Sequence, residues 1–191
     1  PYKTLDDVFE QVEFFVDAVS DYKSDFILFP EYFNAPLMAK FNHLGEAQSI
    51  RGLAQYTEEI RERFVNLAIS YNINIITGSM PLLKEDGALY NVGYLIRRDG
   101  SYEMYEKVHV TPDEQKSWGL SGGKMVKTFD TDCARIGVLI CYDVEFPELS
   151  RIMADQGMQI LFVPFLTDTQ NGYSRVRVCC LLYTSPSPRD S

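Results

Sequence analysis

The sequence predicts an α/β fold in which helices cover a buried sheet, and two observations carry this prediction. First, a helical apolar spacing followed by a short apolar strand recurs at residues 4–30, 49–78 and 147–164. Second, the strands in these units are apolar along their whole length, which is typical of strands covered on both faces. Helices that alternate with such strands indicate a layered α/β architecture.

Composition and charge fit one globular domain and exclude several classes of protein. The chain has 191 residues, of which 46% are hydrophobic and 13% aromatic, so it can bury a substantial core. A net charge of -9 argues against a nucleic-acid-binding surface. No apolar run approaches the roughly 18 residues of a membrane span, and the polar start does not resemble a signal peptide. The four cysteines lack metal-type spacing, which predicts no metal site and a reduced, cytoplasmic protein.

The first half of the chain predicts two helices and two strands. In order, these are a helix over 5–19, a strand over 26–29, a helix over 49–71 and a strand over 73–77. Thr4 and Asp7 form a capping-box pattern at the start of the first helix. Pro30 and Glu31 end the first strand, so a carboxylate is expected at its carboxyl end.

The second half predicts mainly strands. They are expected over residues 89–97, 102–108, 126–129, 136–140 and 159–163, with a Gly-, Ser- and Pro-rich loop over 111–124. Arg98-Asp99-Gly100 is a turn signal between the first two of these strands. A helix is expected to begin at Pro147, where the missing N–H of proline is tolerated in the first turn.

Cys141 ends the apolar strand over 136–140, immediately before a turn into the helix that begins at Pro147. The carboxyl end of a strand is where open α/β sheets place their chemistry. A thiol in such a strand-to-helix turn is held rigidly, and the backbone N–H groups that follow point into the same space. The alternative is that Cys141 is a small buried hydrophobic residue, as most free cysteines are.

Three separate stretches together resemble one family. They are residues 28–31 (LFPE), 105–109 (YEKVH) and 137–143 (GVLICYD), the last followed by FPE at 146–148. In this order, and each at a strand end, they resemble the nitrilase superfamily of carbon–nitrogen hydrolases, whose signature is a Glu, a Lys and a Cys. The resemblance extends from about residue 4 to residue 177. The amino-acid sequence around 33–43 and 168–177 is further similar to that of members fused to an N-terminal acetyltransferase domain. This chain lacks such a domain.

The resemblance implies an α-β-β-α sandwich, here expected to be incomplete at both ends. Residues 1–180 are then a truncated carbon–nitrogen hydrolase domain, and the Pro- and Ser-rich residues 181–191 are predicted to be a non-native or disordered tail. The implied activity is hydrolysis of a small, non-peptide amide through a cysteine thioester, without cofactor or metal. The full-length protein is expected to be a homo-oligomer that binds neither nucleic acid nor membrane.

The same three residues make chemical sense for amide hydrolysis. Cys141 needs a group that takes its proton, because a neutral thiol attacks an amide poorly. Glu31 is the expected general base, since desolvation at the end of a buried strand raises the pKa of a carboxyl group. Lys107 and the backbone N–H of Tyr142 are the expected donors to the oxyanion of the tetrahedral intermediate. Glu31 then returns the proton to the leaving ammonia and activates the water that releases the acid.

Family members carry a second glutamate in the loop after the lysine, and Glu114 is the prediction for it. Asp143, Glu145 and Glu148 are rival carboxylates, although Glu145 or Glu148 could simply favour the amino terminus of the following helix. His109 offers a different mechanism, in which it serves as the base of a Cys–His hydrolase.

Two other functional hypotheses stay open. The first is hydrolysis of a nitrile or an N-carbamoyl compound by the same residues, although Tyr142 and Asp143 after the cysteine look more like the amidase branches. The second is an inactive truncated fragment. The walls of the substrate pocket are expected in the loops after Phe33, Tyr90 and Leu166.

Overall fold

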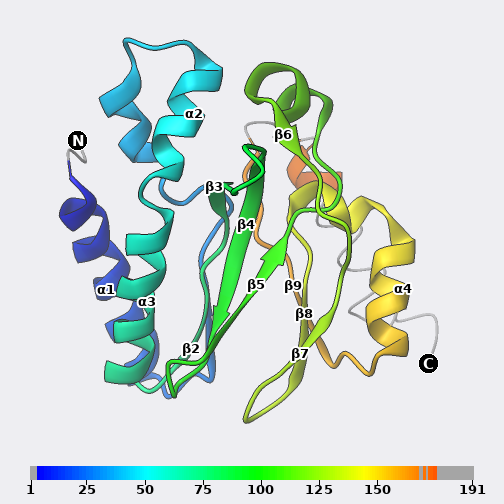
Figure 1. Cartoon of the computed structure of the whole chain (residues 1–191). Coiled ribbons are helices and arrows are strands. Elements are labelled where there is room, and N and C mark those ends of the chain that lie inside the picture. The colour runs from blue at the N-terminus through cyan, green and yellow to red at the C-terminus, as the bar shows by residue number, and fades with distance from the viewer. Residues whose placement is uncertain (1–3, 168–169, 171, 176–191) are drawn as a thin grey trace.

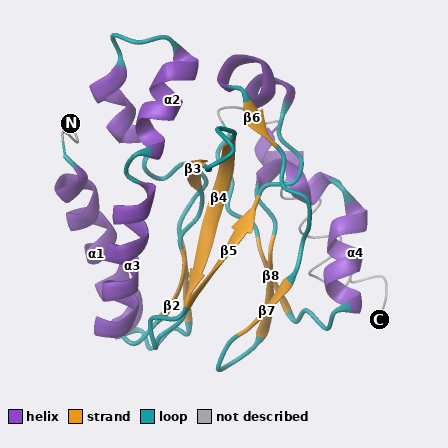
Figure 2. Ribbon diagram, in the orientation of Figure 1, coloured by secondary structure: helices purple, strands orange, loops and turns teal. Residues whose placement is uncertain are grey.

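A computed structural model describes residues 4–167, 170 and 172–175 of the chain (Figure 1). The predicted tail over 181–191 lies outside the described residues. Two sheets lie between helices, which gives the four-layered α-β-β-α sandwich that the sequence predicts (Figures 1 and 2). No helix in the described part of the chain combines the length and apolarity that crossing a bilayer would require.

The first sheet has six strands. They are β1 (Phe26–Leu28), β2 (Asn74–Ile76), β3 (Met80–Leu83), β4 (Leu89–Ile96), β5 (Tyr102–Glu106) and β6 (Leu120–Ser121). The main order is β1-β2-β4-β3, and β5 and β6 also pair with β4. Because β1 is parallel to β2, and β4 is antiparallel to both β2 and β5, strands β1 and β5 run in the same direction. Their carboxyl ends therefore lie at the same edge of the sheet.

The second sheet has three strands in the order β7-β8-β9, namely β7 (Thr128–Asp130), β8 (Arg135–Val138) and β9 (Ile160–Phe162). Strand β8 pairs antiparallel with β7 and parallel with β9. The regular strand ends at Val138, although residues up to 140 were expected to belong to it. The residues after Val138 continue the pairing in irregular form. The N–H of Leu139 donates to Phe162 O, and the N–H of Cys141 donates to Pro164 O.

Helices cover the outer side of each sheet. On the six-stranded sheet lie α1 (Leu5–Asp21), α2 (Glu46–Ala54) and α3 (Thr57–Ser70), whereas α4 (Pro147–Asp155) lies on the three-stranded sheet (Figure 2). The predicted capping box is present, because Thr4 Oγ1 accepts from the N–H of Asp7 and the Asp7 carboxylate accepts from the N–H of Thr4. Each helix turns an apolar face inward, which is the main source of helix stability in a protein of this kind.

The core consists of three clusters, one for each interface between layers. Phe9 and Phe64 pack edge to face, with ring centroids 5.2 Å apart, between the helices and the six-stranded sheet. Tyr105 and Phe129 contribute to the cluster between the sheets. Met153 belongs to a third cluster beneath α4. Continuous packing of this kind fixes the strand ends to which the functional side chains are attached.

Some predicted elements were wrong in extent. The single helix expected over 49–71 is two helices, because the chain turns after Ala54 and Thr57 Oγ1 donates a 2.6 Å hydrogen bond to Pro81 O of β3. The 3₁₀ helix Ala35–Phe41 and strand β3 were not expected. The segment 111–124 is not a loop throughout, since it contains a five-residue π-helical turn, Glu114–Trp118, and strand β6.

Candidate active site

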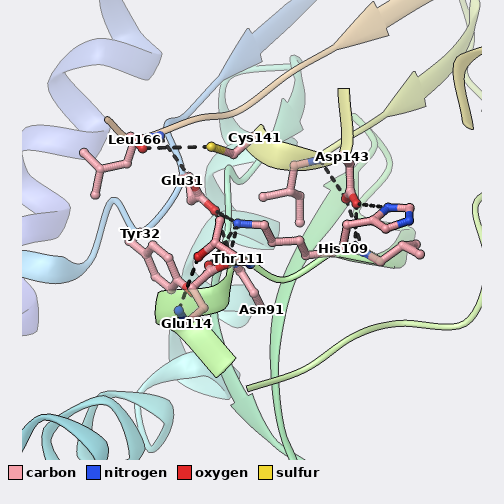
Figure 3. A network of polar contacts seen from close by, with 12 residues as sticks. Glu31, Tyr32, Asn91, His109, Thr111, Glu114, Cys141, Asp143 and Leu166 are labelled. Atoms are coloured by element: carbon pink, nitrogen blue, oxygen red, sulfur yellow. Dashed lines mark hydrogen bonds and ion pairs between the residues drawn. The ribbon is translucent and has the colours of Figure 1, made fainter. Parts of the chain in front are cut away.

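Three of the predicted residues follow the ends of three strands and face one cavity. Glu31 comes three residues after β1, Lys107 directly after β5, and Cys141 three residues after β8. All three, together with Glu114, line a cavity of about 850 Å³. Figure 3 shows Glu31, Glu114 and Cys141 grouped in this region. The site therefore draws on both sheets, since β1 and β5 belong to the six-stranded sheet and β8 to the three-stranded one.

Lys107 lies between two carboxylates at the buried end of the site. Its Nζ is 2.8 Å from Glu31 Oε1 and 2.9 Å from the carboxylate of Glu114, and the residue is only 1% exposed. Burial alone would lower the pKa of Lys107, but the charges of Glu31 and Glu114 outweigh it and raise the pKa above its ordinary value. The ammonium therefore stays charged at neutral pH.

The two oxygens of Glu31 have different partners. Oε1 accepts from Lys107 Nζ and, at 3.0 Å, from Asn91 Nδ2. Oε2 accepts from the backbone N–H of Leu166 at 3.1 Å. Burial raises the pKa of Glu31, and the charge of Lys107 acts in the opposite direction without cancelling the rise. A buried carboxylate with a raised pKa is suited to accept and return a proton near neutral pH.

Cys141 occupies a strained backbone conformation. Its φ of 49° lies in the left-handed region, which residues with a side chain rarely adopt and which recurs at functional sites. Its Sγ lies 3.9 Å from Leu166 O, within weak hydrogen-bonding distance. Burial, and next the negative charge of Glu31, raise the pKa of the thiol to about 12, while Lys107 acts to lower it. The resting thiol is therefore protonated at neutral pH.

Glu114, the predicted second glutamate, is the one of the four candidate carboxylates that contacts Lys107 in the described structure. It also accepts hydrogen bonds from the hydroxyl of Tyr32 at 2.9 Å and from the backbone N–H of Thr111 at 2.7 Å. Glu145 lines the outer cavity, with Oε1 3.6 Å from Arg175 Nε.

The other two rival carboxylates, Asp143 and Glu148, are not among the described residues that line the cavity. Glu148 is exposed in the first turn of α4. Asp143 is buried but contacts the backbone and side chain of His109 rather than the lysine (Figure 3). Three of the four candidate carboxylates therefore have no described contact with Lys107, because the segments that carry them direct their side chains elsewhere.

His109 and Cys141 share no hydrogen bond in the described part of the chain. His109 Nδ1 lies 3.2 Å from Asp143 Oδ1, and the imidazole ring stacks on Phe146 with centroids 3.6 Å apart. These contacts turn the ring away from the cavity, whose described lining does not include His109. The geometry gives no support to a Cys–His pair.

Sequence reasoning missed four residues that hold the carboxylates, namely Tyr32, Asn91, Thr111 and Leu166. Asn91 carries a readable signal, because it is an amide in the middle of a stretch that otherwise predicts an apolar strand, and the structure shows it fully buried. Leu166 acts through its backbone, which no side-chain pattern reveals. Of the loops expected to form pocket walls, the one after Leu166 lines the cavity through Thr167 and Gly172, whereas no residue of 33–45 or 90–106 is among the described lining residues.

No metal site is apparent in residues 4–167, 170 and 172–175, since these contain no group of three or more His, Cys, Asp or Glu side chains placed to hold an ion. The carboxylates near Cys141 instead surround a lysine ammonium. What the site offers chemically is a thiol, a carboxylate of raised pKa and a buried cation around one cavity.

Curated proteins with similar sequences include hydrolases and amidases. The chain is 48% identical over 169 residues to "Probable hydrolase YhcX" of Bacillus subtilis, a match that covers 88% of this chain and 33% of that protein. It is 33% identical over 163 residues to human "Omega-amidase NIT2", which covers 78% of this chain and 54% of the relative. The chain thus spans between a third and about half the length of these relatives.

Solved structures share the fold. A carbon–nitrogen hydrolase from Helicobacter pylori G27 superposes with a TM-score of 0.78 at 20% identity, covering 96% of this chain and 65% of that one. Saccharomyces cerevisiae Nit3, described as a member of branch 10 of the nitrilase superfamily, gives a TM-score of 0.77 at 24% identity, covering 91% of this chain and 64% of that one. At these identities the likeness concerns the fold alone.

The family assignment rests on sequence as well as fold. The sequence profile of the family described as "Carbon-nitrogen hydrolase" matches residues 1–178. The match includes the three strand ends that carry Glu31, Lys107 and Cys141. This chain therefore belongs to the carbon–nitrogen hydrolase family of the nitrilase superfamily.

Proposed function

We propose that the chain carries the active site of an amidase that hydrolyses a small, linear amide through a thioester on Cys141. The observation that supports this proposal best is the buried Lys107, held between Glu31 and Glu114 beside the thiol. A cation, a base and a nucleophile around one cavity are the groups that acyl transfer requires. In this proposal the reaction needs neither a cofactor nor a metal ion.

Glu31 acts as the general base in the first step. Its Oε2 accepts the N–H of Leu166 and keeps a second lone pair that can take the thiol proton. Leu166 O also lies 3.9 Å from Cys141 Sγ, so the thiol and Oε2 both contact the backbone of the same residue. Because the resting thiol is protonated, sulfur attacks the amide carbon as its proton moves to Glu31.

Lys107 stabilises the oxyanion that this attack creates. An ammonium has three N–H donors, and two of them are directed to Glu31 and Glu114. The third is available to the oxyanion, together with the backbone N–H of Tyr142, which follows the nucleophile in the 3₁₀ turn Cys141–Glu145. Glu114 holds Lys107 in place, and its own position is fixed by Tyr32 and Thr111.

The cycle closes with the same groups. Glu31 gives its proton to the leaving nitrogen, ammonia departs, and the acyl group remains on Cys141 as a thioester. Water then enters, Glu31 takes its proton, and the resulting hydroxide attacks the thioester carbon. Collapse of the second tetrahedral intermediate releases the carboxylic acid, and Glu31 returns the proton to sulfur.

The relatives favour an amide as substrate, because several are named omega-amidases and align over 71–78% of this chain. Hydrolysis of a nitrile by the same residues is the second candidate. It is supported by 36% identity over 57% of the chain to a Schizosaccharomyces pombe protein named "Probable nitrilase C965.09". An N-carbamoyl compound would meet the same three groups.

The experiment is an assay of ammonia release from a panel of small amides, nitriles and N-carbamoyl compounds, combined with trapping of the acyl-enzyme. Acid quenching during turnover should leave the acyl mass on the peptide that contains Cys141. Cys141→Ala should abolish both signals, whereas Cys133→Ala, which changes an exposed cysteine, should leave them unchanged. Turnover by Cys141→Ala would contradict the proposal, and a chain inactive on the whole panel would favour the inactive fragment.

We also propose a cytoplasmic location and a homo-oligomeric state. The free thiols of Cys133 and Cys141 support a reducing compartment. The exposed, adjacent rings of Phe14 and Phe15 on α1 are in keeping with a protein interface.

Within the family, we propose that the chain is most similar to the branch fused to an acetyltransferase domain. The residue sequences of 33–43 and 168–177 support this, and the length of YhcX, of which the match covers 33%, leaves room for a further domain. Sequencing the gene on both sides of the coding segment tests it, and flanking sequence unlike an acetyltransferase would contradict it.

A further inference from the structure

The carboxylate of Asp143 is buried between the two strand ends that carry Lys107 and Cys141. The residue is 1% exposed. Its Oδ2 accepts the backbone N–H of Val108 at 3.2 Å and that of Ile140 at 3.3 Å. Val108 directly follows Lys107, and Ile140 directly precedes Cys141. One oxygen atom therefore joins the chain at the lysine to the chain at the nucleophile.

The other oxygen, Oδ1, is equally engaged. It accepts the backbone N–H of His109 at 2.7 Å and lies 3.2 Å from His109 Nδ1 (Figure 3). Phe146 stacks on the imidazole, with ring centroids 3.6 Å apart. Asp143 is not among the described residues that line the cavity, so it contacts the chain that carries the reacting groups rather than the space for substrate.

The two strand ends need such a connection because they come from different sheets. Lys107 follows β5 of the six-stranded sheet, and Cys141 follows β8 of the three-stranded sheet. No backbone pairing joins β5 to β8 in the described chain. Side chains packed between sheets allow small sliding movements, whereas hydrogen bonds to a buried carboxylate have fixed directions.

Asp143 also closes the turn that contains the nucleophile. Its backbone N–H donates to Ile140 O at 3.0 Å, and its carbonyl oxygen accepts from the N–H of Phe146 at 3.1 Å. With the bond from the Ile140 N–H to Oδ2, these contacts enclose Cys141, whose left-handed φ is costly unless its surroundings hold it.

Burying a carboxylate here has an electrostatic cost. This cost indicates that the role of Asp143 is the set of directed hydrogen bonds that its carboxylate accepts. Lys107 and the imidazole of His109 are the ionisable groups that act on it favourably. Burial raises the pKa of Asp143, although hydrogen bonds from His109 and Val108 oppose the rise. A buried anion supported mainly by backbone donors is expensive, and an apolar residue would pack there more cheaply.

We infer that Asp143 is a positioning residue, which sets the placement of Cys141 relative to Lys107 by bridging the backbone on either side of the site. The inference rests on the proposed function, since it assumes that these two residues act together on one substrate. It assigns Asp143 no contact with substrate and no proton transfer.

Asp143→Asn tests the bridge with little change in shape. The amide has only one acceptor oxygen, so its NH₂ group must face either the pair of backbone donors at Oδ2 or the donors at Oδ1. We expect the turn and the strand end to separate slightly and kcat to fall about 100-fold, the scale of a misplacement near 1 Å. KM should change little, because Asp143 does not line the cavity.

Asp130→Asn is the matched control, because Asp130 is an exposed residue of β7 that pairs with Arg135 far from the turn. It should keep wild-type kcat. Alkylation of Cys141 by iodoacetamide gives a readout that needs no turnover. Asp143→Asn should slow it, since a thiol of high pKa depends on alignment with Glu31, and Asp130→Asn should not.

The outcomes separate this inference from the proposed function. Turnover by Cys141→Ala would overturn the function itself. With that variant inactive, wild-type kcat and alkylation in Asp143→Asn would overturn the positioning role. Loss of kcat at unchanged KM and unchanged near-UV spectrum supports it. If Asp143→Asn does not fold, hydrogen exchange in the wild-type chain decides, since rapid exchange of the Val108 or Ile140 amide would overturn the bridge.

Discussion

At the scale of single residues, the site depends on one buried cation that compensates two carboxylates. Lys107 is bound to both Glu31 and Glu114, and the remaining partners of these carboxylates are neutral donors from Tyr32, Asn91 and the backbone. Removing the cation would leave two buried carboxylates without a counter-charge. Stability and catalysis should therefore both respond to a change at Lys107.

Lys107→Met should destabilise the protein by about 3–5 kcal/mol at pH 7, the usual cost of removing one partner of a buried ion pair. Without the cation, the folded-state pKa of Glu31 rises further above its ordinary 4.5. Stability of the variant is then lost as pH rises through that folded-state pKa and regained as pH falls below it. Urea unfolding at pH 7 and pH 5 measures both effects.

Lys127→Met is the control, because Lys127 is an exposed lysine that pairs with Glu103. Its loss should cost less than about 1 kcal/mol, as for other surface pairs. Equal losses in the two variants would show that Lys107 does not compensate the buried carboxylates.

The raised pKa of Glu31 also predicts the pH dependence of turnover. A general base must be unprotonated, so kcat/KM should fall as the pH drops through the pKa of this carboxyl group. Because burial raises that pKa, the acid limb of the profile should lie above pH 4.5. Steady-state rates across the acid range locate the limb, and a midpoint at or below 4.5 would be inconsistent with a desolvated base.

At the scale of elements, the strand ends could be predicted from sequence, but their surroundings could not. Strands β1, β5 and β8 were predicted because each is a short stretch of strand-forming residues with turn residues beside it. Strand β3 was missed, since it contains Pro81 and follows β2 after a short turn. The π-helical turn that presents Glu114 gives no periodic signal, because it is only five residues long.

The break between α2 and α3 depends on a contact between segments distant in sequence. Both helices share a helical apolar pattern, so the sequence predicted one helix across them. The fully buried Thr57 donates to Pro81 O, a partner 24 residues away that local patterns do not reveal.

Thr57→Val should therefore destabilise the fold by about 1–3 kcal/mol, because it leaves Pro81 O buried without its donor. Thr128→Val, at a half-buried position on β7 whose hydroxyl has no described partner, should stay within about 0.5 kcal/mol. Denaturant unfolding of the two variants gives the comparison. Equal stability of both would show that this hydrogen bond does not define the start of α3.

At the scale of the whole molecule, the four layers bring together groups from distant parts of the chain. Glu31, Lys107 and Cys141 were each predicted as strand-end residues. That two sheets face each other so that all three line one cavity follows from packing between sheets, which sequence patterns alone do not specify. The family resemblance implied the α-β-β-α sandwich, and the observed layers confirm that fold.

The outer edge of the three-stranded sheet predicts association in solution. Among the described residues, β9 pairs only with β8, and Ile160 of β9 and Ile152 of α4 are both substantially exposed. Open strand edges and exposed apolar side chains favour contact between chains. We expect the 191-residue chain to associate as its concentration rises, and Ile160→Lys to weaken this. Sedimentation velocity at several concentrations measures it, and a monomer throughout would contradict the expectation.

The central claim is that Glu31, rather than His109, accepts the proton of Cys141. The direct measurement is steady-state ammonia release by Glu31→Gln and His109→Asn, side by side at neutral pH on the best substrate of the panel. Glutamine keeps the shape of the side chain but cannot take the proton, so kcat should fall by at least about 100-fold. His109→Asn should cost far less, since the contacts of the ring with described residues are packing on Phe146 and a polar contact with Asp143. An inactive His109→Asn beside a largely active Glu31→Gln would contradict the account and identify a Cys–His hydrolase instead.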